Sequence, residues 1–201
     1  MCRKQWGTII LTALARTSEQ GPFYIFTAFI FAYGITTLHA SRDLLLLGVL
    51  GAVCISAITI PLSGYVSDLI GRKNMYIIGC ATMGVFGFIY FGMIDTGSSA
   101  LIFAAIVLSL IPHDMQYGPQ AALIDESFTP RLRYSGASIG YQLASITAGG
   151  PAPLIATALF ATYKSGTPIA IYILITAIIS IVATSFLKEY SGKDVSSEYD
   201  A

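Results

Sequence analysis

The chain has 201 residues, of which 55% are hydrophobic and only 11% charged, and its formal net charge at pH 7 is zero. A soluble domain carries about 25% charged residues, so the composition excludes an ordinary soluble domain. The balanced charge and the lack of a basic cluster give no indication of a nucleic-acid partner. Apolar runs of close to 20 residues match the ~30 Å hydrocarbon layer of a bilayer, and the sequence therefore predicts an all-α membrane protein.

Six transmembrane helices are predicted, separated by short polar turn sequences. The predicted spans are Trp6–Leu38, Leu44–Val66, Asn74–Ile94, Ser99–Glu126, Tyr134–Tyr163 and Thr167–Leu187. We expect residues 1–187 to form a six-helix transmembrane bundle and residues 188–201 to form a polar cytoplasmic tail.

The distribution of basic residues predicts the orientation of this bundle. An even number of spans places both termini on one side, together with the second and fourth loops. That side holds eight basic residues and the other side two; the eight are Arg3, Lys4, Arg72, Lys73, Arg131, Arg133, Lys188 and Lys193. Because basic residues favour the cytoplasmic side, we expect a multi-pass protein of the cell inner membrane with both termini in the cytoplasm.

The first predicted span carries charged residues in its interior. Arg16 and Glu19 lie one turn apart in ALARTSEQGPFYIF, and Gln20 continues the same stripe. A charged side chain in the middle of a membrane helix costs about 2.5–3.5 kcal/mol, so such residues face protein or water rather than lipid. Two alternatives follow: the two charges neutralise each other, inside the bundle or near its interface, or Arg16 binds an anionic group of a solute while Glu19 exchanges a proton or pairs with Arg16.

The connection after the second span gathers charges and glycines in GYVSDLIGRKN, residues 64–74. We expect Gly64 to allow a neighbouring helix to approach closely and Gly71 to permit a tight reversal of the chain. Asp68 is expected to accept hydrogen bonds from a helix N-terminus or to pair with a base, and Arg72 and Lys73 to hold the loop on the cytoplasmic face. The plainer alternative is a charged connection without a further role.

The fourth span contains the polar stretch SLIPHDMQYGPQ. A histidine can carry a proton near neutral pH, so His113 and Asp114 are candidates for proton coupling or solute binding. Because adjacent helical residues point about 100° apart, we expect His113 and Asp114 not to share one contact surface. Tyr117 lies on the stripe of Asp114, whereas Gln120 lies on that of His113. The alternative for His113 is an interhelical hydrogen bond with no further role.

Proline and glycine residues are expected to bend two of the helices. Pro112 and Pro119 each free a backbone carbonyl in the fourth span. In the fifth span, Gly149-Gly150-Pro151 weakens the helix, and Gln142 and Tyr141 are the polar residues expected to meet a solute.

Charges cluster between the fourth and fifth spans. Asp125 and Glu126 close the fourth span, and Arg131 and Arg133 follow within eight residues. We expect charge pairing at the cytoplasmic surface; a role in gating is the alternative.

The remaining chemistry-bearing residues predict neither an enzyme nor a metal centre. The three cysteines and two histidines are too scattered to form a metal site. No G-x-x-x-x-G-K-[ST] loop occurs, so the sequence does not predict a P-loop for ATP. No cofactor is predicted, and the apolar composition makes membrane lipid an expected partner.

Two segments resemble the major facilitator superfamily. The first segment, Gly64-x-x-x-Asp68-x-x-Gly71-Arg72-Lys73, is similar to the family's loop signature G-x-x-x-D-x-x-G-R-[RK]. In the family this signature follows the second helix of each six-helix half. The chain departs from it at Leu69, where a basic residue is common. Residues 118–159 resemble the fourth and fifth helices of the C-terminal half in the metabolite:H⁺ symporter branch. The matching elements are Glu126, Pro130-Arg131-x-Arg133, Gly136-Ala137, Gly140-Tyr141-Gln142 and Gly149-Gly150-Pro151-x-Pro153.

This resemblance implies one half of a twelve-helix transporter fold. It further implies that the first and fourth helices line the central cavity, and that Asp68 with the basic residues forms a cytoplasmic lock between the halves. The function expected is secondary active, proton-coupled symport of a small anionic organic metabolite by alternating access. The alternative is a truncated remnant without transport, or a membrane subunit. Either way the partner would be a missing N-terminal half or a second copy.

Overall fold

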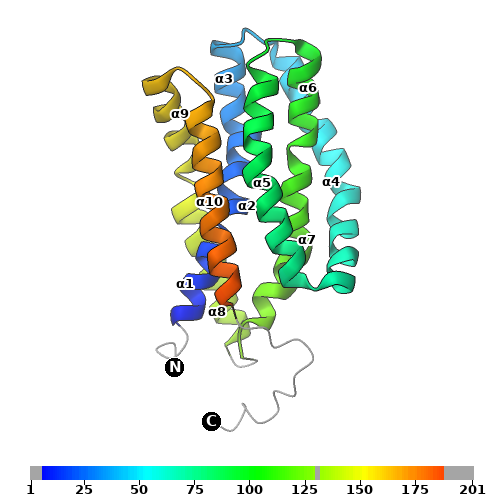
Figure 1. Ribbon diagram of the computed structural model, residues 1–201, viewed down its shortest axis with the longest axis vertical. Helices are drawn as coiled ribbons and strands as arrows, with labels where there is room; N and C mark the ends of the chain where they lie inside the picture. The colour runs from blue at the N-terminus through cyan, green and yellow to red at the C-terminus, as the bar shows by residue number, and fades with distance from the viewer. Residues whose placement is uncertain (1–5, 130–131, 188–201) are drawn as a thin grey trace.

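The computed structural model describes residues 6–129 and 132–187, which form a bundle of long helices (Figure 1). The described part of the chain contains no strand, so the predicted all-α fold is confirmed. The elements in chain order are α1 (Trp6–Ala15), α2 (Thr17–Tyr24), the π-helix η2 (Ile25–Phe29), α3 (Ile30–Thr36), α4 (Arg42–Ile70), α5 (Arg72–Ile94), α6 (Ser99–Leu108), α7 (Leu110–Glu126), α8 (Arg133–Ala144), the π-helix η3 (Ser145–Gly149), α9 (Ala152–Tyr163) and α10 (Thr167–Phe186).

Five helical segments are long and apolar enough to cross a membrane. They are Arg42–Ile70, Arg72–Ile94, Ser99–Glu126, Arg133–Tyr163 and Thr167–Phe186. The first segment, predicted as one uniform span, is instead interrupted at Arg16 and again at η2. The polar stretch from Arg16 to Pro22 lowers its hydropathy, yet α1, α2 and α3 together run the full height of the bundle (Figure 1). The start of α1 and the end of α10 lie at the same end.

Two further interruptions lie where the sequence predicts them. α6 and α7 are separated at Ser109, three residues before Pro112, whose ring cannot donate the backbone hydrogen bond that a continuous helix needs. η3 and the turn at Gly150 and Pro151 separate α8 from α9. A π-helical turn widens the hydrogen-bonding pattern and often marks a functional site.

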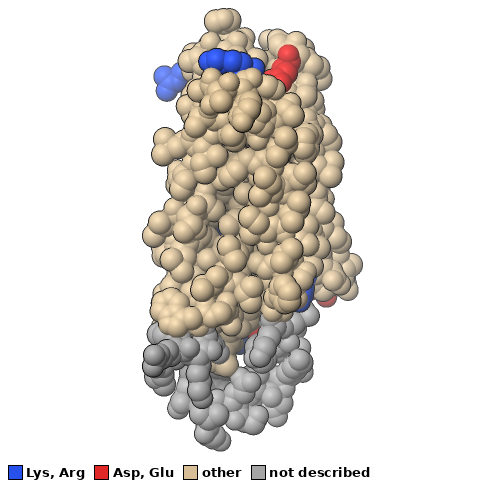
Figure 2. All heavy atoms as spheres, turned by 60° about the vertical axis from the view of Figure 1, so that its left-hand side comes forward, with Lys and Arg blue, Asp and Glu red and all other residues tan. Residues whose placement is uncertain are grey.

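The largest apolar core lies in the half of the bundle away from the termini. It is built around Phe26, Phe29, Tyr33, Tyr90 and Phe91, all buried. The outer surface is apolar over its middle: on the face in Figure 2, lysine, arginine and acidic side chains lie near the two ends. Such a belt is typical of a protein that spans a bilayer.

Small residues bring α4 and α7 into close contact, as predicted for Gly64. A Cβ atom added to Gly118 would lie 2.8 Å from the backbone nitrogen of Gly64 and 2.8 Å from the carbonyl oxygen of Ile60. Two backbones that approach this closely leave no space for a side chain. The contact fixes α7, which carries His113 and Asp114, against α4.

Candidate functional site

The interruption at Arg16 places a guanidinium and a carboxylate side by side inside the bundle. Arg16 Nη2 lies 3.0 Å from Glu19 Oε2, and both side chains are buried. Arg16 Nε donates to Gln120 Oε1 on α7 at 3.1 Å, and Nη1 donates to the backbone carbonyl of Tyr141 on α8 at 3.1 Å. The guanidinium carbon also lies 3.8 Å from the centre of the Tyr141 ring, a cation–π contact. Arg16 thus joins three helical segments.

The Glu19 carboxylate collects the largest number of polar contacts in this cluster. Gln120 Nε2 donates to Oε2 at 3.1 Å, and Gln20 Nε2 donates to the two oxygens at 3.3 and 3.2 Å. His113 Nε2 lies 3.3 Å from Oε1. A buried carboxylate is tolerated in a membrane protein only with such compensation.

His113 connects this carboxylate to a second one. Its Nδ1 lies 3.0 Å from Asp114 Oδ1, and Thr59 of α4 donates to Asp114 Oδ2. The prediction that His113 and Asp114 share no contact surface is therefore wrong, because both side chains are long enough to bridge the 100° between their directions. Glu19, His113 and Asp114 form a continuous chain in which a proton on the imidazole can be exchanged with either carboxylate.

An open hollow of about 370 Å³ lies beside this chain, between α2, α4 and α7. We call it the upper hollow. Its polar walls are Glu19, Gln20, Ser56, His113 and Asp114, and its aromatic walls are Phe23, Tyr24 and Tyr117. The Tyr117 ring stacks on His113, with centroids 5.3 Å apart. Arg16 lies behind Glu19 and is not among the lining residues.

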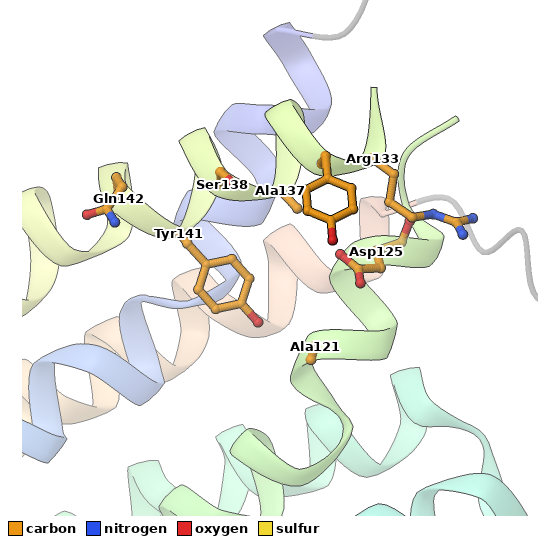
Figure 3. A pocket seen from close by; sticks show the side chains of 8 residues that line it. Ala121, Asp125, Arg133, Ala137, Ser138, Tyr141 and Gln142 are labelled. Carbon is orange, nitrogen blue, oxygen red and sulfur yellow. The ribbon is translucent and has the colours of Figure 1, made fainter. Parts of the chain in front are cut away.

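A second hollow of about 450 Å³ lies between α7 and α8 (Figure 3). We call it the lower hollow. It is lined by Ala121, Asp125, Arg133, Tyr134, Ala137, Ser138, Tyr141 and Gln142. Figure 3 shows the Tyr141 ring pointing between the two helices, toward Ala121. The structure places Gln142, predicted to meet a solute, in this lower hollow rather than with the Arg16 cluster.

The predicted loop at residues 64–74 is a sharp reversal at Gly71. α4 continues to Ile70 and α5 begins at Arg72, because Gly71 alone turns the chain at a φ of 95°. Arg72 Nη2 lies 3.2 Å from Asp68 Oδ1, and Arg72 Nη1 pairs with Glu126 at the end of α7. Asp68 thus pairs with a base, as one of the two alternatives predicted.

The other charges at this end contact backbone carbonyls. Lys73 Nζ donates to the carbonyls of Ser185 and Leu187 at 2.8 and 3.1 Å, where a cation stabilises the end of α10. Arg133 Nε donates to the carbonyl of Asp125 at 2.9 Å. Within the predicted charge group, Glu126 pairs with Arg72, and Arg133 contacts the backbone carbonyl of Asp125. Arg131 lies outside the described residues.

Sequence reasoning missed Thr59, which lies in a long apolar span and donates to Asp114. Gln120 lies on the stripe of His113, as the helical periodicity indicates, and the structure adds its contacts with Arg16 and Glu19. The sequence does not show that Tyr141 contacts Arg16 through its backbone carbonyl and its ring face. Among the described residues, no group of three or more His, Cys, Asp or Glu side chains is arranged to hold a metal ion.

The chain is similar in sequence to known membrane transport proteins. The model of the Major Facilitator Superfamily matches residues 6–200. The shikimate transporter of Escherichia coli (strain K12) is 34% identical over 186 residues, which cover 91% of this chain and 42% of that transporter. A putative metabolite transport protein of Haemophilus influenzae is 34% identical over 200 residues, covering 94% of this chain and 44% of its relative.

A third relative is more distant. The ectoine/proline transporter ProP of Corynebacterium glutamicum is 29% identical over 141 residues, covering 69% of this chain and 28% of that transporter. The chain therefore spans less than half the length of these relatives. No solved structure gives a significant match.

Proposed function

Because the chain belongs to the major facilitator superfamily, we propose that it is one half of a secondary active carrier that moves a small organic metabolite together with a proton. Relatives named as transporters of shikimate, metabolites, and ectoine or proline support the transport of a metabolite. The single observation that carries the proposal is the buried chain from Arg16 through Glu19 and His113 to Asp114, beside the upper hollow. Ionisable groups inside a membrane protein are costly and mark solute or proton pathways.

The ion pair between Arg16 and Glu19 offers a way to couple the two movements. With Glu19 ionised, Arg16 Nη2 is occupied. When a proton passes from His113 Nε2 to Glu19 Oε1, the carboxylate loses its charge and the guanidinium loses its ionic partner. Once the neutral Glu19 side chain moves aside, a carboxylate of the solute can take its place at Arg16, since a buried guanidinium needs an anion. Solute binding and protonation thereby favour each other, as symport requires.

The charges near Gly71 would act as a conformational lock. Arg72 bridges Asp68 on α4 and Glu126 on α7, so these helix ends cannot separate without breaking an ion pair. The positive-inside distribution of basic residues supports a cytoplasmic position for this lock and for both termini. A second six-helix unit, either an N-terminal half or another copy, would complete the cavity.

Uptake by the chain alone and with a second half tests the proposal. The chain would be expressed alone, or together with the N-terminal six-helix half of a relative, and tested with radiolabelled shikimate, proline and ectoine. We expect accumulation of one of them under an inside-alkaline pH gradient, abolished by a protonophore. Uptake by the chain alone would identify a second copy as the partner. No uptake in any pairing would contradict the proposal and favour a remnant that does not transport.

A further inference from the structure

Thr59 on α4 has two acceptors within reach of one hydroxyl hydrogen. Its Oγ1 lies 3.1 Å from the carbonyl oxygen of Ile55, one turn earlier in the same helix, and it also contacts Asp114 Oδ2 on α7. A hydroxyl group has one hydrogen to donate and two lone pairs that can accept. The hydrogen can therefore serve only one of the two oxygens at a time.

The carboxylate of Asp114 has the stronger need for this hydrogen. In an α-helix each carbonyl accepts the backbone N–H four residues later, so the Ile55 oxygen does not depend on the hydroxyl. Asp114 is fully buried, and a buried carboxylate is costly unless its oxygens receive hydrogen bonds. His113 Nδ1 lies 3.0 Å from Oδ1, and Thr59 contacts Oδ2. With Asp114 ionised, the hydroxyl hydrogen thus points to Oδ2.

A proton on Asp114 Oδ2 reverses the direction of this hydrogen bond. The protonated carboxyl donates from Oδ2 to Thr59 Oγ1, and the hydroxyl hydrogen turns to the carbonyl of Ile55. Only the hydrogen moves, because Oγ1 already contacts both oxygens. Oδ1 continues to accept from His113 Nδ1. Neither protonation state therefore leaves an oxygen of the buried carboxyl without a partner.

The charges that face Asp114 come from helices other than α4. The charged and titratable side chains on this side of α7 are His113, Tyr117, Glu19 and Arg16. On α5, the titratable groups that contact α7 meet its glutamines instead; they are Tyr76 and Cys80. None of the α4 side chains that line the upper hollow is titratable. Among these described residues, α4 responds to the charge of Asp114 through the hydroxyl of Thr59.

We propose that Thr59 is a positioning residue for proton binding: its hydroxyl hydrogen turns from Asp114 to Ile55 when Asp114 takes up a proton on Oδ2. The inference rests on the proposed function for the use of this proton in transport. It adds a residue of α4 to a pathway that otherwise joins α2 to α7. The turn of one hydrogen lets the buried carboxyl change its charge without a rearrangement of helices.

This switch supplies the charge balance that the proposed coupling needs. In the empty state His113 carries both N–H protons, so Arg16 and His113 balance Glu19 and Asp114. In the loaded state one further proton is bound on Asp114 Oδ2, and His113 passes its Nε2 proton to Glu19 Oε1. A carboxylate of the solute then balances Arg16. One proton enters with each such carboxylate, and the cluster has no net charge in either state, as a low-dielectric interior favours.

Infrared spectra of the carboxyl group test the switch. Difference spectra between acidic and neutral pH would be recorded for the full chain in lipid nanodiscs. The bands that Asp114→Asn removes are those of Asp114, a carboxylate band at neutral pH and a carbonyl band in acid. Thr59→Val keeps the branched shape but removes the hydroxyl, so it should shift both bands. Thr59→Ser keeps the hydroxyl and should leave both bands at their wild-type positions.

Thr82→Val is the matched control. Thr82 is partly exposed on α5, and its hydroxyl donates to the carbonyl of Ile78, also four residues earlier, at 2.8 Å. This variant should leave the Asp114 bands unchanged. Unshifted bands in Thr59→Val, a shift of the carboxylate band alone, an equal shift in Thr59→Ser, or no protonated Asp114 in the wild type would each overturn the inference. Thr59→Ala removes the same hydroxyl and provides the same test if Thr59→Val does not fold.

Uptake separates this inference from the proposed function. Thr59→Val should lower the initial rate of proton-driven uptake by about tenfold, because a hydrogen bond to a charged group is lost, and Thr59→Ser should keep it within about twofold. Shifted Asp114 bands in a protein that transports nothing would contradict transport and support the role of Thr59. Proton-driven uptake together with unshifted bands in Thr59→Val would contradict the role of Thr59 alone.

Discussion

The guanidinium of Arg16 and the carboxylate of Glu19 meet at 3.0 Å in the interior of the bundle, where their side chains are only 4% and 3% exposed. Arg16 is the turn residue that separates α1 from α2, and Glu19 lies in the first turn of α2. Arg16 reaches toward α8 and Gln120, while Glu19 faces His113 and the upper hollow. Arg16 therefore contacts Tyr141, which lines the lower hollow, while its partner Glu19 lines the upper hollow.

Arg16→Ala should abolish uptake and also lower stability, because it leaves Glu19 ionised and buried without its cation. Breaking a buried pair in this way costs about 3–5 kcal/mol. The double variant Arg16→Ala with Glu19→Gln removes both charges and should recover most of the stability but none of the uptake. Thermal unfolding in detergent and solute uptake, measured on both variants, separate the two effects. Normal uptake with an unchanged KM in the single variant would refute the role of Arg16.

Asp68→Asn should slow turnover without changing solute affinity. The substitution removes one of the two anions that hold Arg72. Because a partly exposed ion pair stabilises a conformation by about 1 kcal/mol or less, the maximal uptake rate should change by no more than about fivefold. Initial uptake rates at a series of solute concentrations give the rate and KM separately. A rise in KM that matches the loss of rate would place Asp68 in the binding site instead of the lock.

Gly118→Ala should destabilise the bundle by about 1–3 kcal/mol, because the added methyl group would meet the backbone of α4 at Gly64 and Ile60. Gly92→Ala is the matched control: it lies in α5, and a Cβ there would have no neighbour within 4 Å. Thermal unfolding of the two variants tests the contact. Equal melting temperatures for both would show that α4 and α7 are not as closely packed as described.

The composition and the cost of buried charge predict much of this arrangement. Hydropathy locates the spans. The free-energy cost of placing Arg16 and Glu19 in an apolar span indicates that their side chains face protein instead of lipid. The turn at Gly71 follows from the conformational freedom of glycine, which its φ of 95° requires.

The contacts between distant segments could not be predicted from the sequence. Thr59 contacts Asp114, and Gln120 contacts both Arg16 and Glu19. These contacts depend on how α4 and α7 are rotated about their axes and how deeply they lie in the bundle. The pairing of Arg72 with Glu126 depends on where two helices end, which no local pattern determines. The four residues that follow Arg16 include no proline that would indicate the interruption there.

The most direct test is proton movement during solute uptake. His113→Gln keeps a polar side chain but removes the group that can carry a proton between Glu19 and Asp114. His39→Gln, at the exposed histidine outside the bundle, is the control. Proteoliposomes containing the chain with its second half and a pH-sensitive dye report both solute and proton entry. We expect protons to enter together with the solute in the wild type and in His39→Gln. In His113→Gln we expect proton entry to be lost while exchange of the solute is retained. Unchanged proton entry in His113→Gln would contradict the account.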